Sequence, residues 1–288
     1  MSSILISVII PVYKDWSRLL LCLEALEYQK NTKSKFEVIV INNDPEDLYV
    51  PENSFSYPVY FLRESIPGSY AARNKGLSKA KGIAILFTDS DCIPANDWIS
   101  QAERLINETE ADLIAGSIKL FSKEENKFVH FERTFAFPNE KYVKDQNFGV
   151  TANLLVRKPV IDKIGGFNEK LLTGGDSEFC NRAVNEGFKI EFHEELKVSH
   201  PARSSWKELK LKAIRFGGRL PNDKNRYVKF LKVLGKFRIR LDDIQEIVSL
   251  EKPSLKQKFD LFFINQSLRW VEAKESLFVF FGKKAGRK

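Results

Sequence analysis

An Asp-x-Asp pair follows a continuous apolar run, and this arrangement constrains the fold more than any other stretch of the chain. The run covers residues 83–87, and Asp89 and Asp91 come just after it. A short apolar run of this kind is typical of a strand buried in a parallel sheet, and open α/β sheets bind ligands at the carboxyl ends of their strands. Two carboxylates there can share a hard divalent cation, which can in turn bind a diphosphate. The alternative is a turn with two solvated aspartates.

The first half of the chain alternates strand-like and helix-like segments. Apolar β-rich runs cover residues 7–12, 36–41, 59–62 and 83–87, and segments of helical spacing cover residues 15–29, 69–80 and 96–107. This rhythm predicts a mostly parallel sheet covered by helices. No Gly-x-Gly-x-x-Gly follows the first run, which excludes the fingerprint of dinucleotide-binding folds.

The cysteines and the N-terminal residues favour a reducing compartment. Cys22, Cys92 and Cys180 lie far apart and match no zinc-binding spacing, which suits a protein without disulfides. The first seven residues contain neither a basic segment nor a cleavage site, so we interpret them as the lead into the first strand. No apolar stretch is long enough to span a bilayer. We therefore expect a cytoplasmic protein.

Positive charge is concentrated in the C-terminal part of the chain. Residues 201–288 contain 22 Lys and Arg against 9 Asp and Glu, whereas residues 1–200 contain 24 against 29. Such an asymmetry indicates an appended surface for an anionic partner, either a membrane or a nucleic acid. Apolar residues beyond Pro201 recur at helical spacing, before and after Pro253. We expect a domain of residues 1–203 and a basic, amphipathic helical extension of residues 204–288.

Several short blocks follow one another in an informative order. They are Ser-Val-Ile-Ile-Pro-Val-Tyr at 7–13, Glu-Val-Ile-Val-Ile-Asn-Asn at 37–43, Ala-Arg-Asn-Lys-Gly at 72–76, the Asp-x-Asp pair, Asn153, Gly-Gly-Phe-Asn-Glu at 165–169 and Gly-Asp-Ser-Glu at 175–178. In this order they resemble the inverting glycosyltransferases of family 2. The resemblance covers about residues 5–200. It implies a GT-A fold, which is an α/β, Rossmann-like fold with a mostly parallel central sheet and flanking helices.

The resemblance implies a site for a nucleoside diphosphate sugar. Asp89 would face the nucleoside, and Arg73 would approach the nucleotide unless it forms only a surface ion pair. Pro11 cannot donate a hydrogen bond within a sheet, so we expect it to end the first strand at the nucleobase site. Tyr13 would pack on the base, or would be a partly buried loop aromatic.

The second apolar run departs from the pattern of the family. Asn42 stands where an Asp is common, and Asp44 follows two residues later. An amide offers both a donor and an acceptor, so Asn42 could still pair with the edge of a base. We therefore count Asn42 and Asp44 among the donor-binding residues. Because of the departure at Asn42, we do not predict that the donor site is specific for uridine.

The resemblance also assigns a metal and a general base. Asp91 would bind Mn²⁺ or Mg²⁺, since both suit carboxylate and phosphate oxygens, and His200 would complete the metal shell or be structural. Asp176 would deprotonate the acceptor hydroxyl, and it could also cap the following helix. The family has an acidic pair here, but Gly175 replaces its first member. Asp176 would thus act alone or with Glu178.

The C-terminal segment combines aromatic residues with basic ones. Seven aromatic residues lie between Phe259 and Phe281, beside a Lys- and Arg-rich end. This combination suits an interfacial helix of residues 254–288 on an anionic membrane, at the inner face of the cell membrane. The alternatives are packing on the catalytic domain or on a second subunit of a homo-oligomer. No nucleic-acid recognition motif accompanies the charge, so we expect no nucleic-acid partner.

The sequence as a whole predicts a metal-dependent, inverting glycosyltransferase. It would move a sugar from a nucleoside diphosphate donor to a hydroxyl of a cell-surface polysaccharide or lipid-linked acceptor. Processive members have transmembrane helices and a Gln-x-x-Arg-Trp motif, to which we interpret residues 266–270 as only a loose match. Transfer of a single sugar is therefore favoured. A nucleotidyltransferase and a catalytically degenerate GT-A scaffold are the alternatives.

Overall fold

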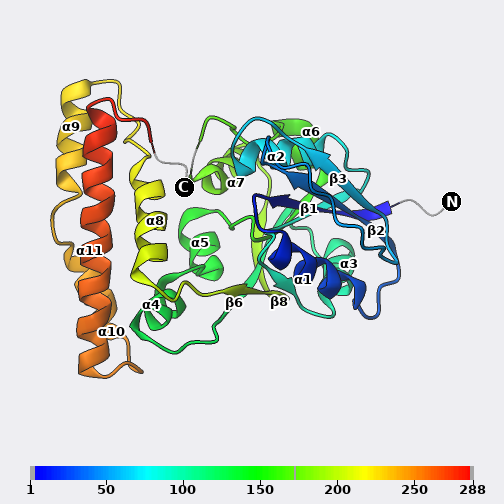
Figure 1. Cartoon of the computed structure of the whole chain (residues 1–288), viewed down its shortest axis with the longest axis horizontal. Coiled ribbons are helices and arrows are strands. Elements are labelled where there is room, and N and C mark those ends of the chain that lie inside the picture. The colour runs from blue at the N-terminus through cyan, green and yellow to red at the C-terminus, as the bar shows by residue number, and fades with distance from the viewer. Residues whose placement is uncertain (1–3, 172, 286–288) are drawn as a thin grey trace. The chain divides into compact units, whose positions relative to one another are not determined.

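The computed structural model describes residues 4–171 and 173–285, which form two compact units (Figure 1). The first unit consists of Met1–Phe121 and Phe137–Pro201, and the second of Ser122–Ala136 and Ala202–Lys288. The sequence pattern did not predict that residues 122–136 would join the C-terminal residues.

The centre of the first unit is a mixed sheet of eight strands. Their order is β3 (Val59–Arg63), β2 (Lys35–Asn42), β1 (Ile4–Val12), β4 (Ala84–Thr88), β7 (Asn153–Arg157), β6 (Leu113–Phe121), β8 (Ile190–Pro201) and β5 (Ile93–Pro94). The four strands of the N-terminal half are parallel, as predicted, and β6 is parallel to β8. The β4–β7, β6–β7 and β5–β8 pairs are antiparallel. The predicted α/β class is therefore confirmed.

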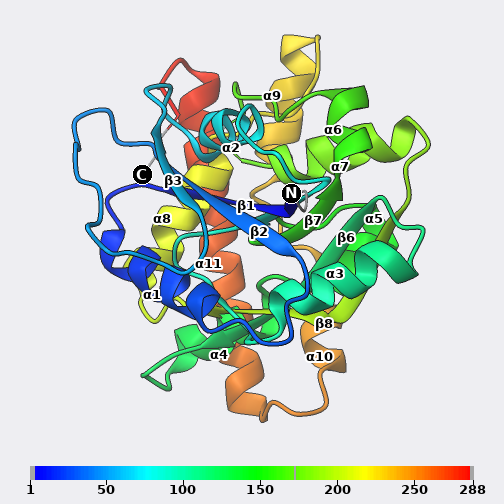
Figure 2. The ribbon, with the colours of Figure 1, turned by 90° about the vertical axis from the view of Figure 1, so that its right-hand side faces the viewer.

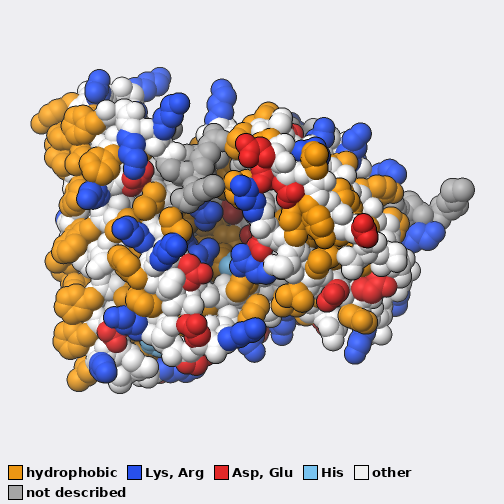
Figure 3. All heavy atoms as spheres, in the orientation of Figure 1, with side chains coloured by type: hydrophobic (Ala, Val, Ile, Leu, Met, Phe, Trp, Pro, Cys, Tyr) orange, Lys and Arg blue, Asp and Glu red, His pale blue; other side chains and the backbone are white. Residues whose placement is uncertain are grey.

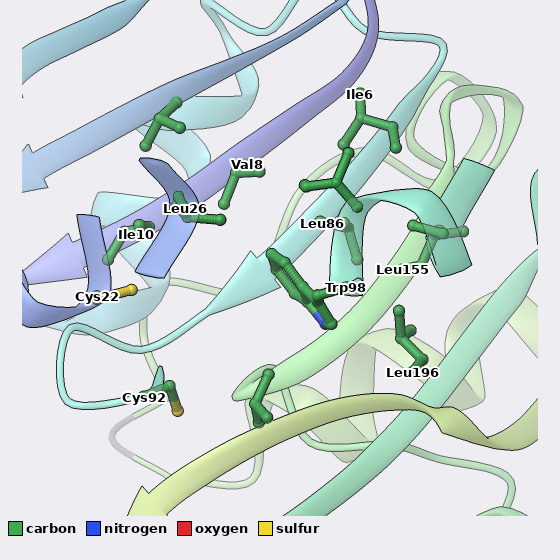
Figure 4. Close-up of a cluster of buried hydrophobic side chains, with 14 of the residues drawn as sticks. Ile6, Val8, Ile10, Cys22, Leu26, Leu86, Cys92, Trp98, Leu155 and Leu196 are labelled. Atoms are coloured by element: carbon green, nitrogen blue, oxygen red, sulfur yellow. The ribbon is translucent and has the colours of Figure 1, made fainter. Parts of the chain in front are cut away.

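Helices cover both faces of this sheet. They are α1 (Trp16–Glu27), α2 (Ser69–Leu77), α3 (Trp98–Glu108), α5 (Asn139–Gln146), α6 (Lys158–Ile164) and α7 (Gly175–Asn185). Alternate residues of β1 point to opposite faces, so Ile6, Val8 and Ile10 pack with α1 and α3 (Figure 4), whereas Ile9 packs with α2 and α7. Figure 2 shows α1 and α3 on one side of these strands and α2 on the other. These four side chains of β1 are fully buried, and their packing fixes the position of the strand end that follows.

The first strand ends at Val12, one residue beyond the predicted end at Pro11. The backbone carbonyl of Val12 accepts a hydrogen bond from the Asn43 amide, so Val12 is directed toward β2. Neighbouring residues of a strand direct their polar groups to opposite sides, and Pro11 therefore faces β4. The pairing of β1 with β4 ends at Ile9, so the missing N–H of Pro11 breaks no bond between these strands.

The second unit is helical. Its helices are α4 (Lys127–Phe135), α8 (Trp206–Gly217), α9 (Arg226–Gly235), α10 (Leu241–Ser249) and α11 (Leu255–Phe280). The long helix predicted after Pro253 is confirmed, and Ser254 begins it with a capping box. The apolar pattern of residues 227–248 forms two helices, because α9 stops at Gly235. None of the described helices has the length and apolar character needed to cross a bilayer.

Candidate active site

Asp89 and Asp91 lie in a turn at the carboxyl end of β4. The strand ends at Thr88, whose hydroxyl donates to the Ala152 carbonyl at 3.0 Å. The Cys92 amide then donates to the Asp89 carbonyl at 3.1 Å, which closes the turn. The predicted buried strand and its terminal carboxylates are thus present, and the turn presents both side chains beyond the sheet edge.

Asp89 forms an ion pair with Arg73 of α2. Arg73 Nη2 lies 2.6 Å from Asp89 Oδ1, and the Arg73 side chain is only 3% exposed, whereas that of Asp89 is 35% exposed. The ion pair is therefore rooted in the interior, in contrast to the surface pair considered from the sequence. The Nε of Arg73 is buried without a hydrogen-bond partner. Such a buried guanidinium places a fixed positive charge behind the carboxylate.

Asp91 lies between two basic side chains from distant parts of the chain. Its Oδ1 is 3.5 Å from His200 Nε2, and its Oδ2 is 3.4 Å from Arg18 Nη1. Burial raises the pKa of Asp91, while His200 and Arg18 lower it and Asp89 raises it. The Asp91 carboxylate therefore lies in a partly buried site together with two basic side chains and a second carboxylate.

The orientation of His200 directs one ring nitrogen at Asp91. His200 is buried at the end of β8, and its Nδ1 lies 2.8 Å from the Pro201 carbonyl oxygen. A carbonyl only accepts hydrogen bonds, so Nδ1 carries a proton, and whenever the ring is neutral the lone pair of Nε2 faces Asp91. Phe137 packs on the ring at a centroid distance of 4.7 Å and holds its position.

Two acceptors that face each other in this way fit a divalent cation. The Nε2 lone pair and the Asp91 carboxylate repel one another unless a cation or a proton lies between them. Carboxylate and imidazole are both ordinary metal ligands, and a backbone carbonyl commonly orients such a histidine. The described residues contain no group of three or more His, Cys, Asp or Glu that could hold a metal. Oxygens of a ligand or of water would therefore have to complete the coordination.

Asp176 lies in the first turn of α7 and is fixed by Thr151. Its Oδ1 accepts a hydrogen bond from the Thr151 hydroxyl at 3.1 Å, and its Oδ2 lies 3.4 Å from the Thr151 amide. Burial raises the pKa of Asp176, Arg73 lowers it and Asp89 raises it, so the three charges interact. The N-cap of α7 is Gly174, so Asp176 is no helix cap.

The ring of Tyr70 fills the space beside Gly175. The Gly175 amide donates to the Tyr70 hydroxyl at 2.8 Å. A Cβ added at Gly175 would lie 2.5 Å from Tyr70 Cζ, which is closer than van der Waals contact permits. Where the resemblance leads one to expect a first acidic residue, this chain therefore has an aromatic ring, and Asp176 stands without an acidic neighbour on that side.

The remaining predicted donor-binding residues follow β1 and β2. Tyr13 is exposed, and the Lys14 ammonium lies 5.4 Å from its ring centroid. The Asn42 side chain accepts from the Asp44 amide at 2.9 Å and donates to the Asp47 carbonyl at 2.8 Å, so it folds its own loop. Asp44 is buried and lies 3.5 Å from Lys14 Nζ. The amide of Asn42 therefore has a local structural role, which the sequence did not predict.

Two residues of this region, Arg18 and Thr151, have no signal in the sequence. Arg18 lies on the exposed side of α1 and also binds Asp15 at 2.6 Å, like any surface arginine. Thr151 lies in the turn before β7. Each acquires its role only because the fold brings its element beside β4 or α7.

Residues 266–270 match the Gln-x-x-Arg-Trp motif in full, and not only loosely as was expected from the sequence. Gln266, Arg269 and Trp270 have the full Gln-x-x-Arg-Trp spacing. In α11 the Arg269 guanidinium donates to Asp243 at 2.8 Å, and the Trp270 indole donates to the Phe237 carbonyl at 3.1 Å. These bonds hold α10 and the end of α9 against α11, so Arg269 and Trp270 have structural roles here. The Gln-x-x-Arg-Trp spacing by itself therefore does not distinguish transfer of a single sugar from repeated transfer.

Comparison with known sequences gives one consistent result. The model of the family Glycosyl transferase family 2 matches residues 7–165. Glycosyltransferase AglE of Haloferax volcanii is 33% identical over 220 residues, which are 74% of this chain and 71% of that protein. An uncharacterized glycosyltransferase of Haemophilus influenzae is 24% identical and covers 92% of both chains.

Solved structures are similar to the chain over most of its length. TarS of S. aureus in complex with UDP-GlcNAc has a TM-score of 0.57 at 17% identity, covering 97% of this chain and 93% of that one. The mannosyltransferase PcManGT of Pyrobaculum calidifontis, in complex with GDP-Man and Mn²⁺, has a TM-score of 0.53 at 14% identity, covering 95% and 74%. The predicted GT-A fold is confirmed. The chain belongs to glycosyltransferase family 2 and is a glycosyltransferase.

Proposed function

We propose that this enzyme transfers a sugar, with inversion, from a nucleoside diphosphate to a hydroxyl of a cell-surface polysaccharide or lipid-linked acceptor. The observation that carries the proposal is the convergence of Asp89, Asp91, His200 and Asp176 around the carboxyl end of β4. Similarity to structures that contain UDP-GlcNAc or GDP-Man supports a nucleotide-sugar donor. Family membership favours this reaction over nucleotidyl transfer.

The donor nucleotide would bind between the ends of β1, β2 and β4. Asp89, held by the buried Arg73, accepts hydrogen bonds from the nucleoside. Tyr13, exposed beyond β1, stacks on the base, and Pro11 supports it from the strand end. Asn42 and Asp44 lie at the end of β2 and contact the base edge, with the loop of residues 42–47 already ordered by the Asn42 amide.

Asp91 and His200 would hold Mn²⁺ or Mg²⁺. When bound there, the cation supplies positive charge to the diphosphate leaving group. Arg18 lies at the same carboxylate and adds a second positive charge on that side. The Nδ1–H of His200, directed at the Pro201 carbonyl, keeps the Nε2 lone pair available.

Asp176 would act as the general base. One of its carboxylate oxygens takes the proton of the acceptor hydroxyl as the hydroxyl oxygen bonds to the anomeric carbon. The bond from that carbon to the diphosphate breaks on the opposite face, and the electron pair leaves with the diphosphate. The Thr151 hydroxyl holds Asp176 in one orientation, and burial raises the pKa of Asp176 and so increases its basicity.

The second part of the proposal concerns location. Residues 1–203 form the catalytic domain and residues 204–288 form a basic extension, whose segment 254–288 binds the inner face of the cell membrane. Phe259, Phe263 and Phe281 of the segment 254–288 are all more than half exposed, which supports an apolar contact surface there. A lipid-linked acceptor would be reached from this position. A homo-oligomer built through the same segment is the competing arrangement.

A thermal-shift screen of nucleoside diphosphates tests the catalytic proposal. Ligands that bind the folded state raise the melting temperature. One nucleoside diphosphate should therefore raise it in the presence of Mn²⁺ or Mg²⁺, and EDTA should abolish this increase. The sugar conjugates of that nucleotide are then assayed for release of the nucleoside diphosphate with candidate acceptors. Equal melting temperatures with every nucleotide would contradict the proposed donor class.

A further inference from the structure

A basic pocket in the second unit belongs to no part of the site described above. It has a volume of about 760 Å³ and lies among α9, the α9–α10 connection and α11. Five cationic side chains line it, against one carboxylate, that of Asp242. The cations are Lys232, Lys236, Arg238, Arg240 and Arg269. Such an excess of positive charge around a cavity of this size favours an anionic ligand.

Part of this positive charge is not neutralised by the protein. Arg240 and Arg269 both bind Asp243, and Lys232 binds Asp223. Neither Lys236 nor Arg238 forms an ion pair with a described carboxylate, and Lys236 Nζ donates instead to the Ser276 hydroxyl at 2.8 Å. Burial lowers the pKa of Lys236, and Glu272 only partly opposes this effect. The Nε of Arg269 is also buried without a partner.

The rim of the pocket is apolar and exposed. Leu231, Ile239 and Leu241 line it and are 47%, 52% and 72% exposed. Further exposed side chains lie on the same helices, including Leu234 of α9 and Phe259 and Phe263 of α11. Figure 3 shows hydrophobic side chains gathered along the edge of the second unit that carries α9 and α11. A cationic pocket surrounded by apolar side chains matches the two parts of a phospholipid.

We propose that this pocket binds the phosphate group of an anionic phospholipid while its apolar rim inserts among the acyl chains. The inference rests on the proposed membrane location, but it names a different surface, formed mainly by residues 228–242. A second copy of the chain is a poorer occupant, because a two-fold contact would bring the same cations together. A free phosphate compound would use the cations and leave Leu231, Ile239 and Leu241 in water.

The test compares pocket variants with a control of equal charge. Lys232→Gln/Arg238→Gln removes two exposed cations of the pocket, and Lys207→Gln/Lys210→Gln removes two exposed cations of α8. The helices α8 and α9 lie on opposite sides of α11 (Figure 1). Partition onto phosphatidylcholine vesicles containing phosphatidylglycerol should fall by about 30-fold for the pocket pair and by no more than about threefold for the control.

A second arm distinguishes lipid from free phosphate. Ile239→Ser/Leu241→Ser should reduce partition onto the same vesicles by at least about tenfold, since it removes the inserted apolar rim. Inorganic phosphate alone should leave the melting temperature of the protein within error. If phosphate raises the melting temperature and the rim variant binds vesicles normally, the pocket serves a soluble anion and the proposal is overturned.

The remaining outcomes separate this inference from the proposed function. If vesicle partition falls equally in the pocket pair and the control pair, the protein is attracted to the membrane by its overall charge. This outcome would refute a defined lipid site but not the membrane location. No binding of the full chain to vesicles would overturn both the pocket and the membrane location. Neither result bears on sugar transfer. Binding of the nucleoside diphosphate is measured in the same variants, and its affinity should equal that of the unmodified enzyme.

Discussion

His200 directs Nε2 at Asp91 Oδ1, 3.5 Å away, while its Nδ1 lies 2.8 Å from the Pro201 carbonyl oxygen. The two residues come from β8 and from the turn after β4, which do not pair with each other. The carbonyl holds a proton on Nδ1, so in the neutral ring Nε2 and the Asp91 carboxylate are two acceptors directed at one point in space.

We predict that His200→Ala weakens the metal-dependent part of nucleoside diphosphate binding by at least about tenfold. The variant leaves the Arg73–Asp89 pair intact, so binding in EDTA should be unchanged. Calorimetric titrations with and without Mn²⁺ measure both quantities. His193→Ala is the control, since His193 binds Glu191 and Glu195 instead of Asp91. Equal metal dependence in both variants would remove His200 from the site.

Replacing the proposed base should separate binding from catalysis. Asp176→Asn keeps the shape of the side chain and one acceptor for Thr151, so the Kd of the donor should change by less than about twofold. The rate of transfer should fall about 10²- to 10⁴-fold, the usual effect of a general base. Glu178→Gln is the control, because Glu178 binds Arg182 at 3.0 Å. A large loss in Glu178→Gln with normal turnover in Asp176→Asn would reverse the assignment.

The same substitution should stabilise the fold at neutral pH. Burial raises the pKa of Asp176, so the folded state disfavours its charge, and this destabilisation is present above the folded-state pKa. Asp176→Asn should therefore gain up to about 2 kcal/mol in the free energy of unfolding at pH 7. The gain should vanish as the pH falls below the pKa of an unfolded Asp, where both states are protonated. Denaturant unfolding of both proteins at several pH values measures this gain. A gain that did not change with pH would contradict the prediction.

A buried carboxylate in the second unit should show the opposite dependence on pH. Glu132 of α4 lies 2.8 Å from Arg203 and 3.0 Å from Lys212. Burial raises the pKa of Glu132, but the two cations more than offset this and the pKa is lowered. Its stabilisation is present above the unfolded-state pKa and is lost as the pH falls through the lower folded-state value.

Glu132→Gln should accordingly lower the free energy of unfolding by about 2–3 kcal/mol at pH 7, because it removes a buried carboxylate that lies between two partly buried cations. The loss should shrink at acidic pH. Circular dichroism during urea titration at several pH values measures this. Glu125→Gln serves as the control, since Glu125 forms an exposed ion pair with Arg133 and should have little effect.

Gly175 and Tyr70 should be coupled. Gly175→Ala places a Cβ 2.5 Å from Tyr70 Cζ and should cost about 1–3 kcal/mol of stability. The control, Gly235→Ala at the end of α9, has open space and should be neutral or slightly stabilising. In a double-mutant cycle, Tyr70→Ala should remove most of the cost of Gly175→Ala. Additive effects would mean that Tyr70 does not exclude a side chain here.

The sequence determined the four strands of the N-terminal half of the sheet, their parallel pairing and the candidate residues that follow their ends. The run at residues 83–87 predicted β4 and the position of Asp89 and Asp91 after it. A short buried strand can be predicted in this way because the preference for it depends on the apolar and β-branched residues of the segment itself. The bounds of β1 and the break between α9 and α10 were less well predicted. They depend on which neighbouring strand or helix is in contact, and local pattern does not contain this information.

Only the tertiary structure decided which side chains meet. That Arg18 and His200 flank Asp91, that Thr151 orients Asp176 and that Tyr70 occupies the space beside Gly175 all join residues from separate elements. The sequence supplied the chemistry of the carboxylates and the imidazole. The distances, the burial that raises the pKa of Asp91 and Asp176, and the tautomer of His200 follow from packing, because each depends on atoms that chain order leaves far apart.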